Sequence, residues 1–83
     1  MKNIIQDWIV EWFSKRNPKK SISLNSDYYV QGLVDSLGII QLITEIEQHF
    51  SVCFDNEDFK SPSFLTIEGL VSIIYTKIPR TTI

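Results

Sequence analysis

The stretch GLVDSLGIIQLITEIEQHF, residues 32–50, contains the pattern that decides the fold of this chain of 83 residues. It begins with Asp35, a good helix N-cap, and continues with apolar residues that are mostly three positions apart. This spacing predicts an amphipathic helix from Ser36 to Phe50. Ile40 fits the apolar stripe that faces the core, whereas Ile39 lies off the stripe and is expected to be exposed. The stripe consists of Leu37, Ile40, Ile43, Ile46 and Phe50.

Two more amphipathic helices are predicted, one towards each end of the chain. The first spans about residues 3–16, and Asn17-Pro18 ends it. The last begins after Thr66, which is a suitable N-cap, and ends before Pro79. Within it, Gly69 is expected to be a minor local weakness, because glycine lowers helix propensity. The apolar residues at helical spacing are Ile5, Trp8, Ile9, Trp12 and Phe13 in the first helix and Ile67, Leu70, Val71 and Ile74 in the last.

The segments between these helices show no sustained period. Residues 18–34 are expected to form a long loop, and residues 51–54 an extended connector. Residues 56–59 can make one helical turn, but Pro62 prevents a full helix. The side chains expected to fill the core from these segments are Tyr28, Tyr29, Val30, Leu33 and Cys53.

Together these elements predict an all-α fold, a four-helix bundle with three long helices, one short helix and a long loop between the first two. A chain of this length supports one domain with one modest core. We therefore expect a single domain over residues 1–83, with an ordered core at about 4–78 and a loose tail at 79–83. The residues expected in the core are Trp8, Ile9, Trp12, Leu42 or Ile43, Ile46, Phe50, Leu70, Val71 and Ile74.

Composition and charge exclude several classes of function. The single Cys53 and the single His49, which is expected at the surface, leave no disulfide and no zinc-binding set, so we expect no metal site. Residues 21–68 hold eight acidic residues against Lys60 alone, which argues against nucleic-acid binding and favours basic protein partners. The segment MKNIIQDWIVEW has too many polar residues for a signal peptide or a membrane span. We expect a monomeric, cytoplasmic protein.

Ser36 stands at the start of the central helix, and two chemical uses of its hydroxyl can be compared. A hydrolase nucleophile needs a base within reach and a Gly-x-Ser-x-Gly turn after a strand. Here Val34 replaces the first glycine, and His49 lies about 20 Å further along the helix at 1.5 Å per residue. The geometry therefore argues against a hydrolase. An attachment point fits better, because a helix N-terminus favours an anion such as a phosphodiester.

The order of these motifs resembles the acyl carrier protein family. The resemblance rests on Gly-x-x-Asp-Ser-Leu at residues 32–37, on QLITEIEQHF after it, and on EDFKSPSFLTIEGLVSII with its phrase Phe-x-Thr-Ile-Glu at residues 64–68. It covers residues 4–78 in the family's order: a long first helix, a long loop, the Asp-Ser-Leu helix, a short helix and a last helix. The resemblance implies a carrier protein and not an enzyme.

The resemblance implies that Ser36 carries 4′-phosphopantetheine, an arm from coenzyme A whose thiol holds an acyl or aminoacyl group as a thioester. Asp35 would help to present Ser36 for loading, and Leu37 would contact partners or the base of the arm. The implied partners are a phosphopantetheinyl transferase, a ligase that loads the cargo, and downstream synthases or transferases. The docking residues expected on the central helix are Leu37, Ile39, Gln41, Glu45 and Glu47.

The sequence departs from carriers of fatty-acid synthesis in the residues after the serine. Those carriers usually have acidic residues where this chain has Gly38, Gln41, Gln48 and His49. The pattern is closer to free-standing carriers of specialised pathways and to D-alanyl carrier proteins, and it leaves the cargo open among fatty acyl, polyketide and amino-acid groups. The alternative hypothesis is a helical adaptor that keeps the carrier fold, acts only by protein binding and leaves Ser36 unmodified.

Overall fold

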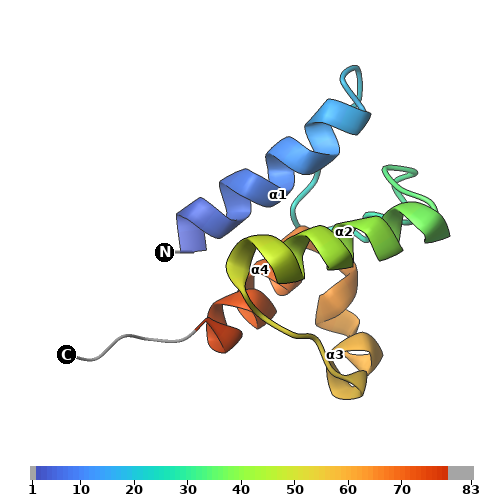
Figure 1. Ribbon diagram of the computed structural model, residues 1–83. Helices are drawn as coiled ribbons and strands as arrows, with labels where there is room; N and C mark the ends of the chain where they lie inside the picture. Colours follow the sequence, from blue (N-terminus) through green and yellow to red (C-terminus); the bar gives the residue numbers. More distant parts are fainter. Residues whose placement is uncertain (1, 79–83) are drawn as a thin grey trace.

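Figure 1 shows the protein as a computed structural model, which describes residues 2–78. Its elements in chain order are α1 (Lys2–Arg16), α2 (Ser36–Phe50), α3 (Asn56–Lys60), the 3-10 turn η1 (Pro62–Leu65) and α4 (Ile67–Lys77). In this range the β-type pairing is an isolated bridge between Asp27 and Thr66. The predicted all-α bundle, with a long loop between its first two helices, is confirmed. The tail predicted at 79–83 lies outside the described residues.

Helices α1 and α2 diverge from each other at one end of the bundle (Figure 1). Helix α1 packs against α4, and α4 also packs against η1. In Figure 1, α1 and α3 lie on opposite sides of α2, and α1 diverges from α2 towards the end at which α1 finishes and α2 starts. The first residues of α2 therefore lie at the wider end of this pair of helices.

The core draws on every long helix and on the loops. As predicted, Ile9, Trp12, Ile46 and three residues of α4 are buried, whereas Trp8 and Phe50 are only partly buried. Of the two alternatives in the middle of α2, Leu42 is fully buried and Ile43 is partly buried. The complete buried set is Ile5, Ile9, Trp12, Phe13, Tyr28, Leu33, Leu42, Ile46, Val52, Phe64, Ile67, Leu70, Val71 and Ile74.

The long loop contributes fewer core residues than its sequence suggests. Tyr28 and Leu33 are buried as expected, and the Tyr28 hydroxyl donates a hydrogen bond to the Phe64 carbonyl. Burial, and then the nearby Asp27 carboxylate, raise the pKa of Tyr28, so the hydroxyl stays a donor. The expectation that Tyr29 and Val30 enter the core is wrong, because both are exposed. The Asp27 carboxylate accepts hydrogen bonds from their backbone N–H groups in a tight turn, and this turn directs the two side chains outwards.

Packing around α4 adds a reason for one glycine, and the chain after α2 corrects one further expectation. Gly69, expected as a minor local weakness of helix propensity, is required by packing, because a Cβ atom there would lie 2.0 Å from the backbone oxygen of Ser63. Glycine is thus needed where α4 presses on η1. Cys53 is exposed and not a core residue, since its neighbour Val52 fills the core from the extended connector. His49 is exposed, as expected, and its ring stacks on Trp8 with centroids 5.0 Å apart.

Candidate functional site

Ser36 is the first residue of α2, and its position is fixed by the residue before it. Asp35 is the N-cap, with an extended backbone, and its carboxylate accepts a hydrogen bond of 2.7 Å from the Gly38 N–H. The Asp35 carbonyl accepts the first helical hydrogen bond, from Ile39 N–H at 2.9 Å. The cap predicted from sequence is therefore present, and Ser36 is exposed beside it.

Two side chains that follow α1 hold the loop that leads into this cap. The Asn17 side-chain amide donates hydrogen bonds to the carbonyls of Phe13 at 3.0 Å and Leu33 at 2.8 Å. The Lys20 ammonium donates to the Gly32 carbonyl at 2.9 Å, where Gly32 has a φ of 74° that suits glycine. Sequence reasoning missed this role, because Asn17 marked only the end of the first helix and Lys20 was assigned no contact.

Gly38 allows Val34 to pack on the first turn of α2. A Cβ atom at Gly38 would lie 2.4 Å from Val34 Cγ2 and 3.2 Å from an Asp35 carboxylate oxygen. Real side chains do not approach so closely, so a larger residue would displace Val34 or the cap. Gly38 stands where carriers of fatty-acid synthesis usually have an acidic residue. The close contact with Val34 explains why this position holds a glycine.

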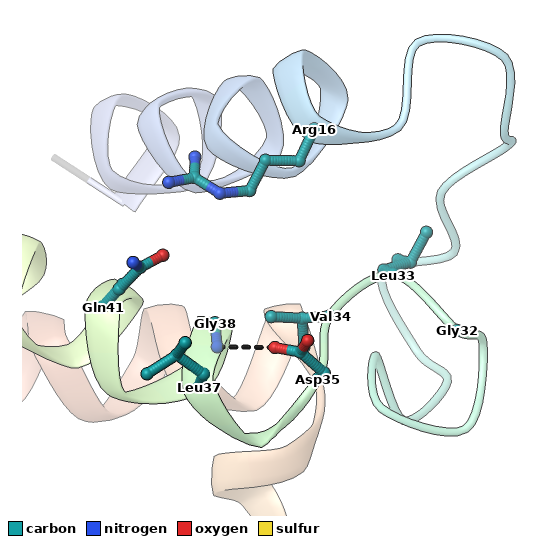
Figure 2. Close-up of a pocket in the computed structure, with 8 residues that line it drawn as sticks. All are labelled: Arg16, Gly32, Leu33, Val34, Asp35, Leu37, Gly38 and Gln41. Carbon is teal, nitrogen blue, oxygen red and sulfur yellow. Dashed lines mark hydrogen bonds between the residues drawn. The ribbon is translucent and has the colours of Figure 1, made fainter.

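A hollow of about 590 Å³ lies between the end of α1 and the start of α2. Figure 2 shows that Arg16 enters this space from α1, opposite Leu37, Gly38 and Gln41 of α2. The Arg16 guanidinium carbon lies 3.6 Å from the centroid of the Trp12 ring, and the group pairs with Glu45 at 3.7 Å. Sequence reasoning assigned Arg16 no role in this site. The lining residues are Arg16, Gly32, Leu33, Val34, Asp35, Leu37, Gly38 and Gln41.

The predicted docking residues of α2 lie in different environments. Leu37 is 65% exposed and Gln41 is exposed, whereas Glu45 is partly buried. Glu47 is also partly buried, and its carboxylate accepts a hydrogen bond from the Phe54 N–H at 3.0 Å, so it helps to hold the connector after α2.

The assignment of the two adjacent isoleucines is reversed. Ile40 is 61% exposed, whereas Ile39 is partly buried against the core. The stripe that faces the core is Ile39, Leu42, Ile43, Ile46 and Phe50, which follows the ideal i, i+3, i+4, i+7 spacing.

The comparison with protein-family models agrees with this geometry. Residues 7–72 match the family model described as phosphopantetheine attachment site, a range that includes Ser36 and parts of all three long helices. The chain belongs to this family. It is a phosphopantetheine carrier domain, and the family's domains are carriers and not catalysts, which phosphopantetheinyl transferases modify and pathway enzymes use. None of the curated proteins matches the chain.

The start of α2 in this carrier domain fits a phosphodiester-linked arm. The first N–H groups of a helix have no partner within the helix, so the N-terminus of α2 favours an anion next to the exposed Ser36. Between residues 2 and 78 no cluster of three or more His, Cys, Asp or Glu side chains is placed to hold a metal ion. The same described range contains no helix with the length and apolar character of a membrane span.

Proposed function

We propose that Ser36 is the residue on which this carrier domain holds 4′-phosphopantetheine, and that the domain carries an acyl or aminoacyl group to the enzymes of one pathway. The observation that carries the proposal is the exposed Ser36 at the first position of α2, directly after the Asp35 cap. The arm supplies the thiol that forms the thioester with the cargo. The chain supplies the anchor and the surface that partners recognise.

Asp35 supports this role through its bond to Gly38. Because its carboxylate is engaged by the Gly38 N–H, the first turn of α2 is held in one geometry and Ser36 is presented outside it. The positive end of the helix dipole then lies close to the attached phosphate. Asp35 therefore acts as a positioning residue for loading.

The exposed face of α2 is the surface that we assign to partners. Leu37 and Ile40 are exposed apolar side chains. Gln41 is also exposed and lies four residues after Leu37, so these two side chains are neighbours on the same side of the helix. The partners expected there are a phosphopantetheinyl transferase, a cargo-loading ligase and a downstream synthase or transferase. Gly38, Gln41, Gln48 and His49 in place of acidic residues favour a free-standing carrier of a specialised pathway, or a D-alanyl carrier, over a carrier of fatty-acid synthesis.

Intact mass after co-expression with a phosphopantetheinyl transferase tests the attachment. The wild-type chain should gain the mass of one arm, and Ser36→Ala should gain none while its circular dichroism stays helical. Ser72→Ala removes an exposed serine of α4 and is the matched control, which should load fully. If Ser36→Ala still gained the arm, the anchor would be another residue.

The exposed apolar pair Leu37 and Ile40 also favours a second candidate, an adaptor that acts only by protein binding with Ser36 unmodified. The same mass measurement separates the two. A wild-type chain that stays unmodified with an active transferase supports the adaptor and contradicts the carrier.

A further inference from the structure

Three neighbouring hollows of about 590, 290 and 210 Å³ lie along the seam between α1 and α2. Arg16 lines all three, Gln41 is shared by the first two, and Glu45 is shared by the last two. These shared walls make the hollows one feature, which we call the α1–α2 groove.

The groove starts beside the proposed attachment residue. Asp35 and Leu37, the two neighbours of Ser36, line its first hollow, and Trp8 and Trp12 line its last. From Ser36 to Glu45 the distance along the helix axis is about 14 Å at 1.5 Å per residue. The backbone of the phosphopantetheine arm is comparable to that of about five extended residues, roughly 17 Å. An arm on Ser36 is therefore long enough to reach Glu45, which lines the last hollow.

The walls of the groove suit the chemistry of this arm, which combines a branched dimethyl segment with two amides. Val34, Leu37 and Ile40 offer apolar surface near the start of α2. The Gln41 amide can both donate and accept hydrogen bonds, and Arg16 offers several donors from the opposite side, as Figure 2 shows.

Two side chains of α1 that line the groove, Trp12 and Arg16, carry hydrogen-bond donors. Trp12 is 5% exposed, and within residues 2–78 its indole N–H finds no hydrogen-bond acceptor. A buried donor without a partner destabilises the fold, and a ligand carbonyl that reached the indole N–H would remove this cost. The Arg16 pair with Glu45 is long, at 3.7 Å, and both side chains are at least 40% exposed. Exposed ion pairs of this kind contribute little to stability, so Arg16 can exchange Glu45 for another partner at little cost.

We propose that the α1–α2 groove is the resting site of the phosphopantetheine arm held by Ser36, and that Arg16 and Trp12 bind the amide carbonyls of the arm from α1. This inference rests on the proposed attachment to Ser36. It assigns α1 a role in holding the arm between encounters with partners, and a partner that docks on α2 must then draw the arm out of the groove.

Nuclear magnetic resonance of ¹⁵N-labelled protein, before and after loading, tests the groove. Intact mass first confirms the arm on Ser36. Loading should then shift the Trp12 indole N–H and the Gln41 side-chain signals, and nuclear Overhauser contacts should join the arm methyl groups to Leu37 or Ile40. Full loading with these signals unchanged and no such contacts would overturn the groove and leave the carrier function intact. If no mass were gained, attachment itself would fail, and the groove with it.

A pair of charge variants shows whether Arg16 takes part. Arg16→Gln in the loaded protein should reduce the Trp12 indole shift and the Overhauser contacts to less than half of their wild-type values. Lys19→Gln removes an exposed neighbouring cation that does not line the groove, and it should behave as wild type. Equal losses in both variants, or none in Arg16→Gln, would contradict the role of Arg16. The wild-type comparison stands even if a variant does not fold.

Discussion

At the scale of single residues, the start of α2 depends on two side chains and one missing side chain. Asp35 fixes the first turn by accepting from Gly38 N–H, and Val34 covers that turn because Gly38 has no Cβ atom. Asp35 was predicted as the cap from its residue type alone. The contact between Val34 and Gly38 was not, because sequence spacing says nothing about how a loop residue folds back over a helix.

Gly38→Ala tests this contact. A Cβ atom 2.4 Å from Val34 Cγ2 should destabilise the fold by about 1–3 kcal/mol, as overpacking does, against a gain of up to about 1 kcal/mol from helix propensity. Urea denaturation measures the net loss. In the double variant Val34→Ala/Gly38→Ala the colliding methyl group is gone, so most of the penalty of Gly38→Ala should disappear. A Gly38→Ala protein more stable than wild type would show that Val34 moves away freely.

At the scale of elements, local pattern predicted the helices, but it did not predict the rotation of α2. Leu37, Ile39, Ile40 and Ile43 are all apolar, so two overlapping stripes fit the sequence, and packing against the rest of the bundle selects the one with Ile39. The turn η1 was also not predicted. Pro62, which prevents a longer helix, is the first residue of η1, where its fixed φ is favourable and its missing N–H is not needed.

A largely buried ion pair joins the end of α4 to α3 and makes stability depend on pH. The Lys77 ammonium lies 2.6 Å from one Asp58 carboxylate oxygen, and the two side chains are 19% and 16% exposed. Burial alone would raise the pKa of Asp58, but the Lys77 hydrogen bond and those of the Asp55 cap lower it overall. The Asp58 hydrogen bond, opposed by burial, raises the pKa of Lys77.

Lys77→Met tests this link between α3 and α4. Because the pKa of Asp58 is lowered in the folded state, Asp58 contributes fully to the free energy of unfolding at pH values above its pKa in the unfolded chain, which is near 4. This contribution is lost as the pH falls through the folded-state pKa of Asp58. Lys77→Met should cost roughly 1.5–3 kcal/mol in urea denaturation at pH 7, the range for hydrogen bonds to charged groups, and less at pH 3. Lys15→Met breaks the exposed pair with Glu11 and serves as control. An equal cost of Lys77→Met at both pH values would exclude the ion pair as its cause.

At the scale of the whole molecule, the acidic middle of the chain and the apolar residues beside Ser36 give two different accounts of how partners dock. Residues 21–68 hold eight acidic residues and one lysine, which favours long-range attraction of basic partners. The structure, however, engages Glu47 with the Phe54 N–H and pairs Glu45 only loosely with Arg16, at 3.7 Å, while Leu37 and Ile40 stay exposed. Sequence alone overstated the role of Glu47 in particular, because it did not show the internal hydrogen bond of this carboxylate. We therefore expect apolar contact to supply most of the affinity.

Ile40→Ala separates these accounts, with a phosphopantetheinyl transferase as the probe. Burying an isoleucine contributes about 1.5–3 kcal/mol, so Ile40→Ala should weaken binding to the transferase roughly ten- to a hundredfold, and this loss should persist at high salt. Ile39→Ala is the matched control: it should lower stability, because Ile39 packs on the core, and leave the affinity of the folded protein unchanged. Exposed charges are screened within about 8–10 Å at physiological salt, so docking by charge would weaken steeply across a salt series. If Ile40→Ala bound normally while Glu45→Gln removed most of the affinity and its salt dependence, the carrier would dock by charge.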